Sequence, residues 1–184
     1  MIFLIIVAVI ILILVLMYNS LVGKKNQVEN IFASVDTQLK KRYDLIPNLV
    51  ANVKEYMDHE KEVLDSVTSL RAQAIKPEIA DTQKIDLDNQ FTKALGSLMI
   101  AVEAYPELKA NENVLQLQSS LNEVEAQISA SRRAYNQAVT DYNNALEMIP
   151  TNFMASAMNY KRKDVFVINE LQRENIDVKE LFNS

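Results

Sequence analysis

The residue types that most often carry out chemistry in proteins are scarce in this chain of 184 residues. It contains no cysteine and a single histidine, His59, which lies in the segment MDHEKE. The zinc motif H-E-x-x-H would need a second histidine at position 63, where the sequence has Val63. Neither a Gly-rich phosphate-binding loop nor a G-x-S-x-G nucleophile motif occurs. We therefore predict a non-enzymatic protein without metal or cofactor; acid–base or metal chemistry on carboxylates alone is the remaining catalytic alternative.

The composition points away from nucleic acid and toward helices. The formal net charge is −5, and basic and acidic residues alternate along the chain instead of forming a basic stripe. Glycine occurs twice and proline four times, so residues that favour turns are few. We therefore expect an all-α protein that does not bind nucleic acid.

The N-terminal residues form an apolar run that could cross a membrane. The first 17 residues, MIFLIIVAVIILILVLM, include no charged and no hydrogen-bonding polar side chain. As a helix they span roughly 25 Å, and Leu21 and Val22 extend the stretch toward the roughly 30 Å of a hydrocarbon core. We therefore expect a transmembrane anchor over residues 1–22. A cleaved signal peptide is the alternative, but no basic residue precedes the run and bulky residues follow it.

The charges that flank this anchor predict its orientation. The basic residues nearest to it all follow it in the chain: Lys24, Lys25, Lys40, Lys41 and Arg42. Because basic residues near a span favour the cytoplasmic side, we expect the body over residues 23–163 to face the cytoplasm.

The first part of the body has the spacing of a long amphipathic helix. Apolar residues recur every three or four positions from Val28 to Leu70. Pro47 falls inside this pattern and removes one backbone hydrogen bond, but the apolar spacing continues through it unchanged. We therefore expect a kink between Tyr43 and Pro47 and not a break.

A second helix is expected after a connection over residues 75–86. Asp86 or Asp88 is its candidate N-cap. It should end at Tyr105, because the residue before a proline disfavours the helical conformation.

The third helix has the most regular spacing in the chain, with strictly alternating steps of three and four residues. It should begin at Asn111 or Asn113 and end at Pro150. Its heptad seam consists of Val114, Leu117, Leu121, Val124, Ile128, Ser131, Tyr135, Ala138, Tyr142, Ala145 and Ile149. The small and polar members indicate close packing inside a bundle. The fold class is therefore all-α, an N-terminal transmembrane helix continuing into a long antiparallel bundle of three to four main helices.

The expected helix lengths do not match one another. The three helices would be roughly 80, 30 and 55 Å long. Antiparallel neighbours of such unequal length cannot fully cover each other. Either the first helix folds back at Pro47 or other copies of the chain cover the bare stretches, so we predict homo-oligomerisation.

A short helical segment over residues 153–160 should follow, with Thr151 or Asn152 as its cap. Its candidate membrane-contact residues, an apolar face and a basic cluster, are Phe153, Met154, Met158, Lys161, Arg162 and Lys163. Such a segment could dock on anionic lipid, but we prefer to interpret it as a cap on the end of the bundle. Residues 164–184 form a tail in which a final short helix is an open alternative.

Five unusual segments stand out in addition to the helical spacing. They are YNSLVGKKNQVEN from Tyr18, QLKKRYDLIPNLV from Gln38, VKEYMDHE from Val53, VEAYPELKANENVLQLQ from Val102 and SRRAYNQAVTDYN from Ser131. In this order and spacing they resemble the LemA family of bacterial membrane proteins, over roughly residues 1–163. The resemblance implies a single-pass protein of the bacterial cell membrane with a helical-bundle body. It implies no enzymatic activity, cofactor or catalytic residue; members are described as envelope-associated, sometimes encoded near a membrane metallopeptidase, and one branch takes part in magnetosome formation.

Two of these segments contain the residues that we single out as a candidate structural or interaction cluster, mostly polar: Arg42, Tyr43, Asp44, Pro47, Asn48, Arg132, Arg133, Tyr135, Asn136, Tyr142 and Asn143. The first five surround the expected kink, where carbonyls freed by the proline need donors such as Asn or Arg side chains. The others lie on the third helix, which could pack against the kink. A buried polar network that holds the bundle in register is our preferred interpretation, and a partner- or ligand-binding patch is the main alternative.

These observations lead to three hypotheses about function. The first is a non-catalytic, membrane-anchored helical scaffold or assembly protein that associates with itself. The second is an adaptor or regulator of another membrane protein, such as an envelope metallopeptidase, with recognition on the heptad face. The third is a membrane-remodelling protein that acts on the lipid bilayer through residues 153–163.

Overall fold

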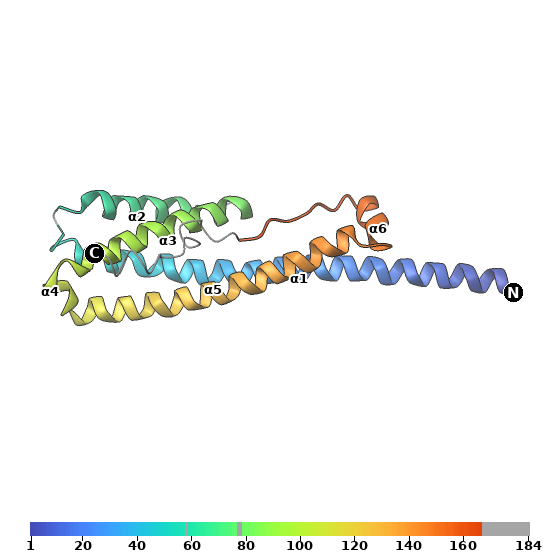
Figure 1. Cartoon of the computed structure of the whole chain (residues 1–184), viewed down its shortest axis with the longest axis horizontal. Helices are drawn as coiled ribbons and strands as arrows, with labels where there is room; N and C mark the ends of the chain where they lie inside the picture. The colour runs from blue at the N-terminus through green and yellow to red at the C-terminus, as the bar shows by residue number, and fades with distance from the viewer. Residues whose placement is uncertain (58, 77–78, 167–184) are drawn as a thin grey trace, which may run out of the picture.

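The computed structural model describes residues 1–57, 59–76 and 79–166, and within these ranges every regular element is a helix. The predicted all-α fold with an N-terminal apolar helix is therefore confirmed. Figure 1 shows an elongated bundle from which one helix projects. In chain order the elements are α1 (Ile2–Val53), α2 (Lys61–Ala74), α3 (Asp81–Glu103), α4 (Pro106–Lys109), α5 (Glu112–Glu147) and α6 (Thr151–Ala157).

The helix α1 joins the apolar N-terminus to the body without interruption. It has 52 residues and is therefore roughly 78 Å long. Its side chains from Ile2 to Leu16 are exposed, and this part projects beyond the bundle (Figure 1). Within the part of the chain that the structure describes, α1 is the one helix whose length and composition suit a membrane span.

The predicted single helix from Val28 to Leu70 is wrong at its C-terminal end. The helix passes through Pro47 without a break, as expected, but α1 ends at Val53 and the chain then turns back into α2. Met57, which continues the apolar spacing, lies in the connection and is buried there at 1% exposure. The apolar spacing therefore continues through the α1–α2 connection, because the connection itself contributes the Met57 side chain to the core.

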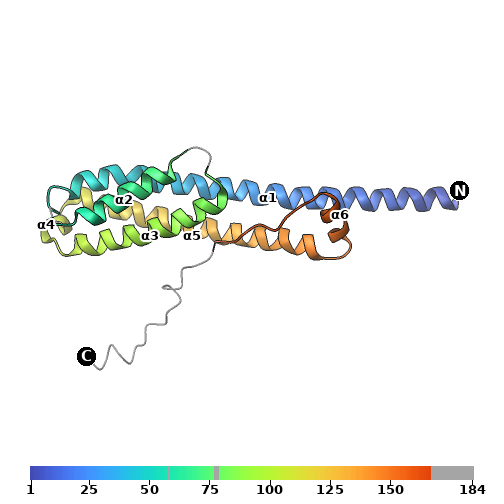
Figure 2. The same ribbon diagram turned by 90° about the horizontal axis from the view of Figure 1, so that it is seen from above.

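Two antiparallel helix pairs make up the body. The most extensive contact is between α1 and α5, and the next most extensive is between α2 and α3 (Figure 2). The predicted heptad seam of α5 is its buried face, with Leu117 and Ser131 half-buried. Ile149 is the one wrong member, since α5 ends at Glu147 and the Ile149 side chain is 78% exposed.

The predicted helix boundaries hold in part. Asn111 caps α5, because its side-chain oxygen accepts hydrogen bonds from the backbone N–H groups of Asn113 and Val114. The expected cap at Asp86 or Asp88 is wrong, since α3 begins at Asp81 with Ala80 as its N-cap. These two aspartates lie inside α3.

The end of the bundle near the apolar stretch is closed by α6. The expected caps at Thr151 or Asn152 are wrong, because Pro150 is the N-cap of this helix. The Thr151 hydroxyl instead lies within hydrogen-bond distance of the carbonyls of Ala145 and Met148, at 2.7 and 2.9 Å, so its one hydrogen is donated to either or shared between them at the end of α5. After α6 the chain returns along the bundle as an extended segment (residues 160–166; Figure 1).

The observed arrangement resolves the mismatch in helix lengths. With α1 ending at Val53, its part inside the body is matched by the 36 residues of α5, roughly 54 Å. The coverage reaches Leu21, which is fully buried against Ala145 and Ala155. The length argument for homo-oligomerisation therefore no longer applies, and self-association stays a prediction without that support. The tail over residues 164–184, in which a final short helix is an open alternative, is extended at residues 164–166, and the rest of it lies outside the described residues.

Candidate functional site

The centre of the body holds a buried ionic cluster of Arg42, Asp88 and Arg132. These residues come from α1, α3 and α5, and the side chains of Arg42 and Asp88 are 0% exposed. One carboxylate oxygen of Asp88 accepts from Arg42 and the other accepts from Arg132. Arg42 also donates to the Thr92 hydroxyl at 3.0 Å and to the Glu125 carboxylate at 2.9 Å. The cluster therefore ties three helices from both pairs to one another.

Aromatic rings enclose the Arg42 guanidinium in this cluster. Its central carbon lies 4.8 Å from the Phe91 ring centre and 5.7 Å from that of Tyr43. The two rings meet edge to face, with centres 5.0 Å apart. Because two guanidiniums face the carboxylates of Asp88 and Glu125, the formal charges of the cluster balance, as a buried site requires.

Burial shifts the ionisation of two groups in and beside the ionic cluster. Desolvation, and then the charge of Arg42, lowers the pKa of the Arg132 guanidinium to about 10, so it is still protonated at neutral pH. Desolvation raises the pKa of the Tyr43 hydroxyl, against the opposing effect of Arg42. Tyr43 is therefore neutral at physiological pH and is unsuited to act as a base.

The proline in α1 is compensated by a side chain from α2. Pro47 has no N–H to donate to the carbonyl of Tyr43, four residues earlier. The Arg71 side chain reaches across from α2 and donates its Nε–H to that carbonyl at 2.8 Å. The expectation that a freed carbonyl would take an Asn or Arg donor is therefore confirmed, with the donor on a different helix. The bond also fixes α2 against α1.

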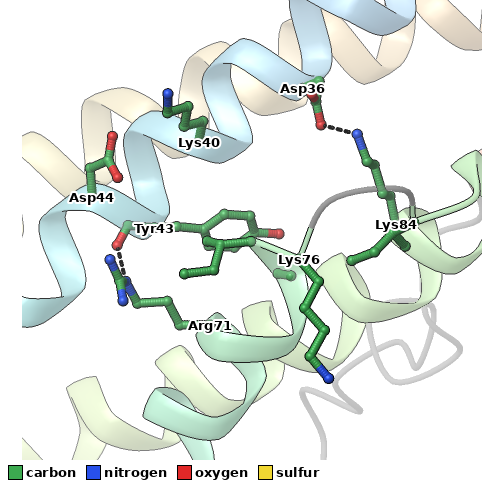
Figure 3. Close-up of a pocket in the computed structure, with 10 residues that line it drawn as sticks. Asp36, Lys40, Tyr43, Asp44, Arg71, Lys76 and Lys84 are labelled. Atoms are coloured by element: carbon green, nitrogen blue, oxygen red, sulfur yellow. Dashed lines mark hydrogen bonds and ion pairs between the residues drawn. The ribbon is translucent and has the colours of Figure 1, made fainter.

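An open cavity of about 620 Å³ lies beside this contact, between α1 and the α2–α3 connection. Figure 3 shows the Tyr43 ring extending from α1 into the space near Arg71, Lys76 and Lys84. Lys84 pairs with Asp36 across the cavity, with 2.7 Å between nitrogen and oxygen. Four basic and two acidic side chains line the cavity, so its walls carry a positive excess: Lys40, Arg71, Lys76, Lys84, Asp36 and Asp44.

Two asparagines of α5 bind the extended segment through its backbone. Asn143 donates to the Lys163 carbonyl at 2.9 Å and accepts from the Lys163 N–H at 3.0 Å. Asn136 makes the same pair of bonds to Phe166, at 2.9 and 2.8 Å. The two asparagines are two helical turns apart, so both side chains face the extended segment. Each of them bonds to the N–H and the C=O of one residue, as a residue of a neighbouring strand would. They also place the Phe166 ring 5.3 Å from that of Tyr135 in the core.

The predicted polar cluster is thus divided among several places. Arg42, Tyr43 and Arg132 come together, as the network interpretation expected. Tyr135, Asn136, Tyr142 and Asn143 lie further along α5, against α1 or the extended segment. The remaining four are exposed and outside the ionic cluster: Asp44, Pro47, Asn48 and Arg133.

Sequence reasoning missed the residues that complete the ionic cluster, above all Asp88. A signal was present, because Asp88 lies on the apolar spacing of α3 between Ile85 and Phe91, all three of which are buried. A charged residue in such a position is a candidate for a buried ion pair. The other residues that the prediction missed are Arg71, Thr92, Glu125 and Phe166.

The predicted membrane-contact face is also divided. Met154 and Met158 are half-buried and pack around Leu21, so they cap the bundle as we preferred. Phe153 is not part of this packing, and its side chain is 71% exposed. Of the basic residues, Lys161 and Arg162 are exposed and Lys163 is half-buried.

Comparison with known proteins identifies the family. The model of the LemA family matches residues 31–179, which is most of the chain. The chain belongs to the LemA family. The match includes the two arginines of the ionic cluster and the two asparagines that bind the extended segment, Asn136 and Asn143. It also extends into residues 164–179, which the resemblance of the five segments did not reach.

Individual relatives support this membership. The chain is 26% identical to Protein LemA of Metamycoplasma hominis over 165 residues, which cover 90% of this chain and 75% of that protein. It is 35% identical over 79 residues to Magnetosome protein MamQ 2 of Paramagnetospirillum magneticum, covering 43% of this chain and 29% of that protein. Magnetosome protein MamQ of Magnetospirillum gryphiswaldense is 32% identical over a stretch of the same length. The chain therefore spans less than a third of the length of the MamQ proteins.

Proposed function

We propose that this LemA-family chain is a non-catalytic scaffold, anchored in the bacterial cell membrane by one helix, with its body on the cytoplasmic side. The observation that carries the proposal is the continuity of α1. Its exposed apolar stretch and its core-forming part are one helix, and Leu21 is fully buried only five residues after the exposed Leu16. This continuity favours the interpretation of the apolar stretch as a retained anchor and not as a cleaved signal peptide.

The arrangement suits positioning more than catalysis. No flexible linker separates the apolar stretch from the body, so the bundle is held at a fixed height above the membrane. The most deeply buried charges, Arg42 and Asp88, pair with each other and with side chains of α5, so they connect three helices.

Sidedness can be tested directly, because the chain has no cysteine. A single Ser119→Cys variant places a thiol on the exposed face of α5. The positive-inside pattern predicts that a membrane-impermeant maleimide labels this thiol only after the cytoplasmic membrane is opened. Labelling in cells whose cytoplasmic membrane is intact would refute the cytoplasmic placement of the body.

Self-association is part of the scaffold proposal and needs its own test. The full-length protein in nanodiscs or mild detergent should have a mass greater than one copy, measured by light scattering over a range of concentrations. Cross-linking in native membranes should give the same species. A monomer in both experiments, without a co-purifying protein, would refute the scaffold role.

An adaptor role is the second candidate, and its recognition surface must differ from the one expected. The heptad face of α5 is occupied by α1 and is therefore closed to a partner. A cleft of about 200 Å³ between α3 and α5 is open instead. Its lining is mainly uncharged and includes Leu95, Gly96 and Met99. Gly96→Leu should fill this cleft, since apart from its chain neighbours and the backbone of its own helix no atom lies within 4 Å of a Cβ at this position. If a membrane protein co-purifies with the unchanged chain and is lost from the Gly96→Leu variant, the adaptor role is favoured over the scaffold role.

A further inference from the structure

The turn between α5 and α6 exposes three large apolar side chains together. Met148 is 63% exposed, Ile149 is 78% exposed and Phe153 is 71% exposed. Among the described residues beyond Tyr18, Ile100 at 74% is the other large apolar side chain with comparable exposure. We refer to Met148, Ile149 and Phe153 as the apolar turn. Exposed apolar side chains that are grouped in this way mark a surface that contacts a partner or a membrane.

The position of the apolar turn indicates what that neighbour is. Ala145 of α5 packs beside Leu21 of α1, and the two helices are antiparallel. Each residue after Ala145 therefore moves about 1.5 Å toward the N-terminus of α1, so Met148 reaches the level of Tyr18. Tyr18 follows directly on the apolar run, where a tyrosine suits the boundary between lipid and water. Figure 1 shows α6 at the same end of the bundle, where the bare part of α1 begins.

Basic side chains surround this end of the bundle. Lys24 and Lys25 follow Tyr18 on α1, and the exposed Lys161 and Arg162 follow α6. Arg162 pairs with Glu147, the last residue of α5, so the basic residues after α6 lie next to the apolar turn. Apolar side chains flanked by lysines and arginines are typical of a segment that lies in the headgroup region of an anionic membrane.

We propose that the apolar turn inserts into the headgroup region of the same membrane that α1 crosses. This inference rests on the proposed span of α1 and deepens it, because it gives the body a second attachment beside its helix. Lipid is the occupant because the apolar turn is level with the end of the apolar run, where a second copy of the chain would have to displace headgroups. With two attachment points the long axis of the bundle is fixed relative to the membrane plane.

Single tryptophans provide the test, since the chain contains none. Phe153→Trp places a fluorescent side chain on the apolar turn. Leu12→Trp marks the apolar stretch, and Leu115→Trp marks the far end of α5, roughly 50 Å from Met148. All three positions are exposed, so the fold should tolerate each change, which circular dichroism can verify. Each full-length variant is reconstituted in vesicles of phosphatidylcholine and phosphatidylglycerol whose acyl chains carry bromine near the headgroup or near the chain end.

The expected result is a blue-shifted emission for the Phe153→Trp variant, with stronger quenching by bromine near the headgroup than near the chain end. The Leu115→Trp variant should emit as in water and stay unquenched. If the Phe153→Trp variant also stays unquenched while the Leu12→Trp variant is quenched, the span holds and the inserted turn is refuted. Blue-shifted emission without quenching would also refute insertion, because it places the side chain against protein. If the Leu12→Trp variant is unquenched, the span itself fails, and the proposal fails with it.

Discussion

Removing the negative charge of Asp88 should destabilise the fold, because this carboxylate is buried between Arg42 and Arg132. The substitution Asp88→Asn keeps the shape of the side chain but leaves two guanidiniums sharing a neutral amide at a site that is 0% exposed. Removing one partner of a buried ion pair costs about 3–5 kcal/mol. Arg42 keeps Glu125 and Thr92, and the Arg132 side chain is 21% exposed and can turn toward water. We therefore expect a loss near the lower end, about 3 kcal/mol.

The measurement is the free energy of unfolding of the full-length protein in detergent, followed by far-ultraviolet circular dichroism during denaturant titration. Asp44→Asn is the matched control, because Asp44 is exposed and lies two residues from Arg42 on the same helix. A surface change of this kind should alter the free energy by no more than about 0.5 kcal/mol. The contrast between the two aspartates isolates the effect of the buried pair from that of net charge.

A double variant makes the reasoning refutable. Arg42→Met together with Asp88→Leu replaces the buried charges by apolar side chains, an exchange that is often neutral or stabilising. The double variant should therefore be more stable than Asp88→Asn alone. If Asp88→Asn costs less than about 1 kcal/mol, or if the double variant costs more than the single one, the ionic cluster does not hold the helices together in the way described.

Three further predictions concern other contacts of α1 and α5. Arg71→Met should lower the free energy of unfolding by about 1–3 kcal/mol, because it leaves the Tyr43 carbonyl without its donor. The same change should cost less in a Pro47→Ala background, where alanine restores a backbone N–H within the helix, and a double-mutant cycle measures the difference. Asn136→Ala and Asn143→Ala should each speed hydrogen exchange in the extended segment while the amides of α2 keep their protection. Above pH 10 the contribution of Tyr43 to the free energy of unfolding should fall, since the unfolded Tyr43 ionises at its ordinary pKa of 10.0 and the folded one, with a raised pKa, keeps its proton. Arg132, whose folded pKa is lowered to about 10, acts in the opposite direction, so the Tyr43 contribution is measured as a difference: denaturant titrations should give a less negative change with pH for the Tyr43→Phe variant than for the unchanged protein.

The main helices could be predicted from sequence wherever apolar spacing and burial coincide. The seam of α5 is the clearest case, because each residue from Val114 to Ala145 on that spacing is buried or half-buried. The turn after Val53 could not be found in this way. It contains neither glycine nor proline, and the buried Met57 imitates the next position of a helix. Periodicity reports which side chains enter the core, but not whether the backbone between them stays helical.

The polar contacts were predictable in kind but not in partner. The sequence indicated that Arg42 and Arg132 belong to one network, and that the carbonyl freed by Pro47 needs a donor. Asp88 lies on the apolar spacing of α3, but the sequence could not indicate which arginines it binds, and it could not indicate Arg71, because α2 follows a turn that the spacing concealed. Partner choice depends on how the two helix pairs are placed, and that information is absent from any single helix.

The continuity of α1 also fixes the rotation of its apolar stretch, the proposed membrane span, relative to the body. An α-helix turns about 100° per residue, so one residue inserted after Tyr18 would rotate the apolar stretch by that angle while the bundle from Leu21 onward kept its packing. A segment that touches only lipid has no preferred face and would tolerate such an insertion. A segment that packs against another membrane protein would lose that contact and regain it after about seven inserted residues, close to two full turns. The angular phase of α1 therefore carries information on whether its neighbours in the bilayer are lipids or protein.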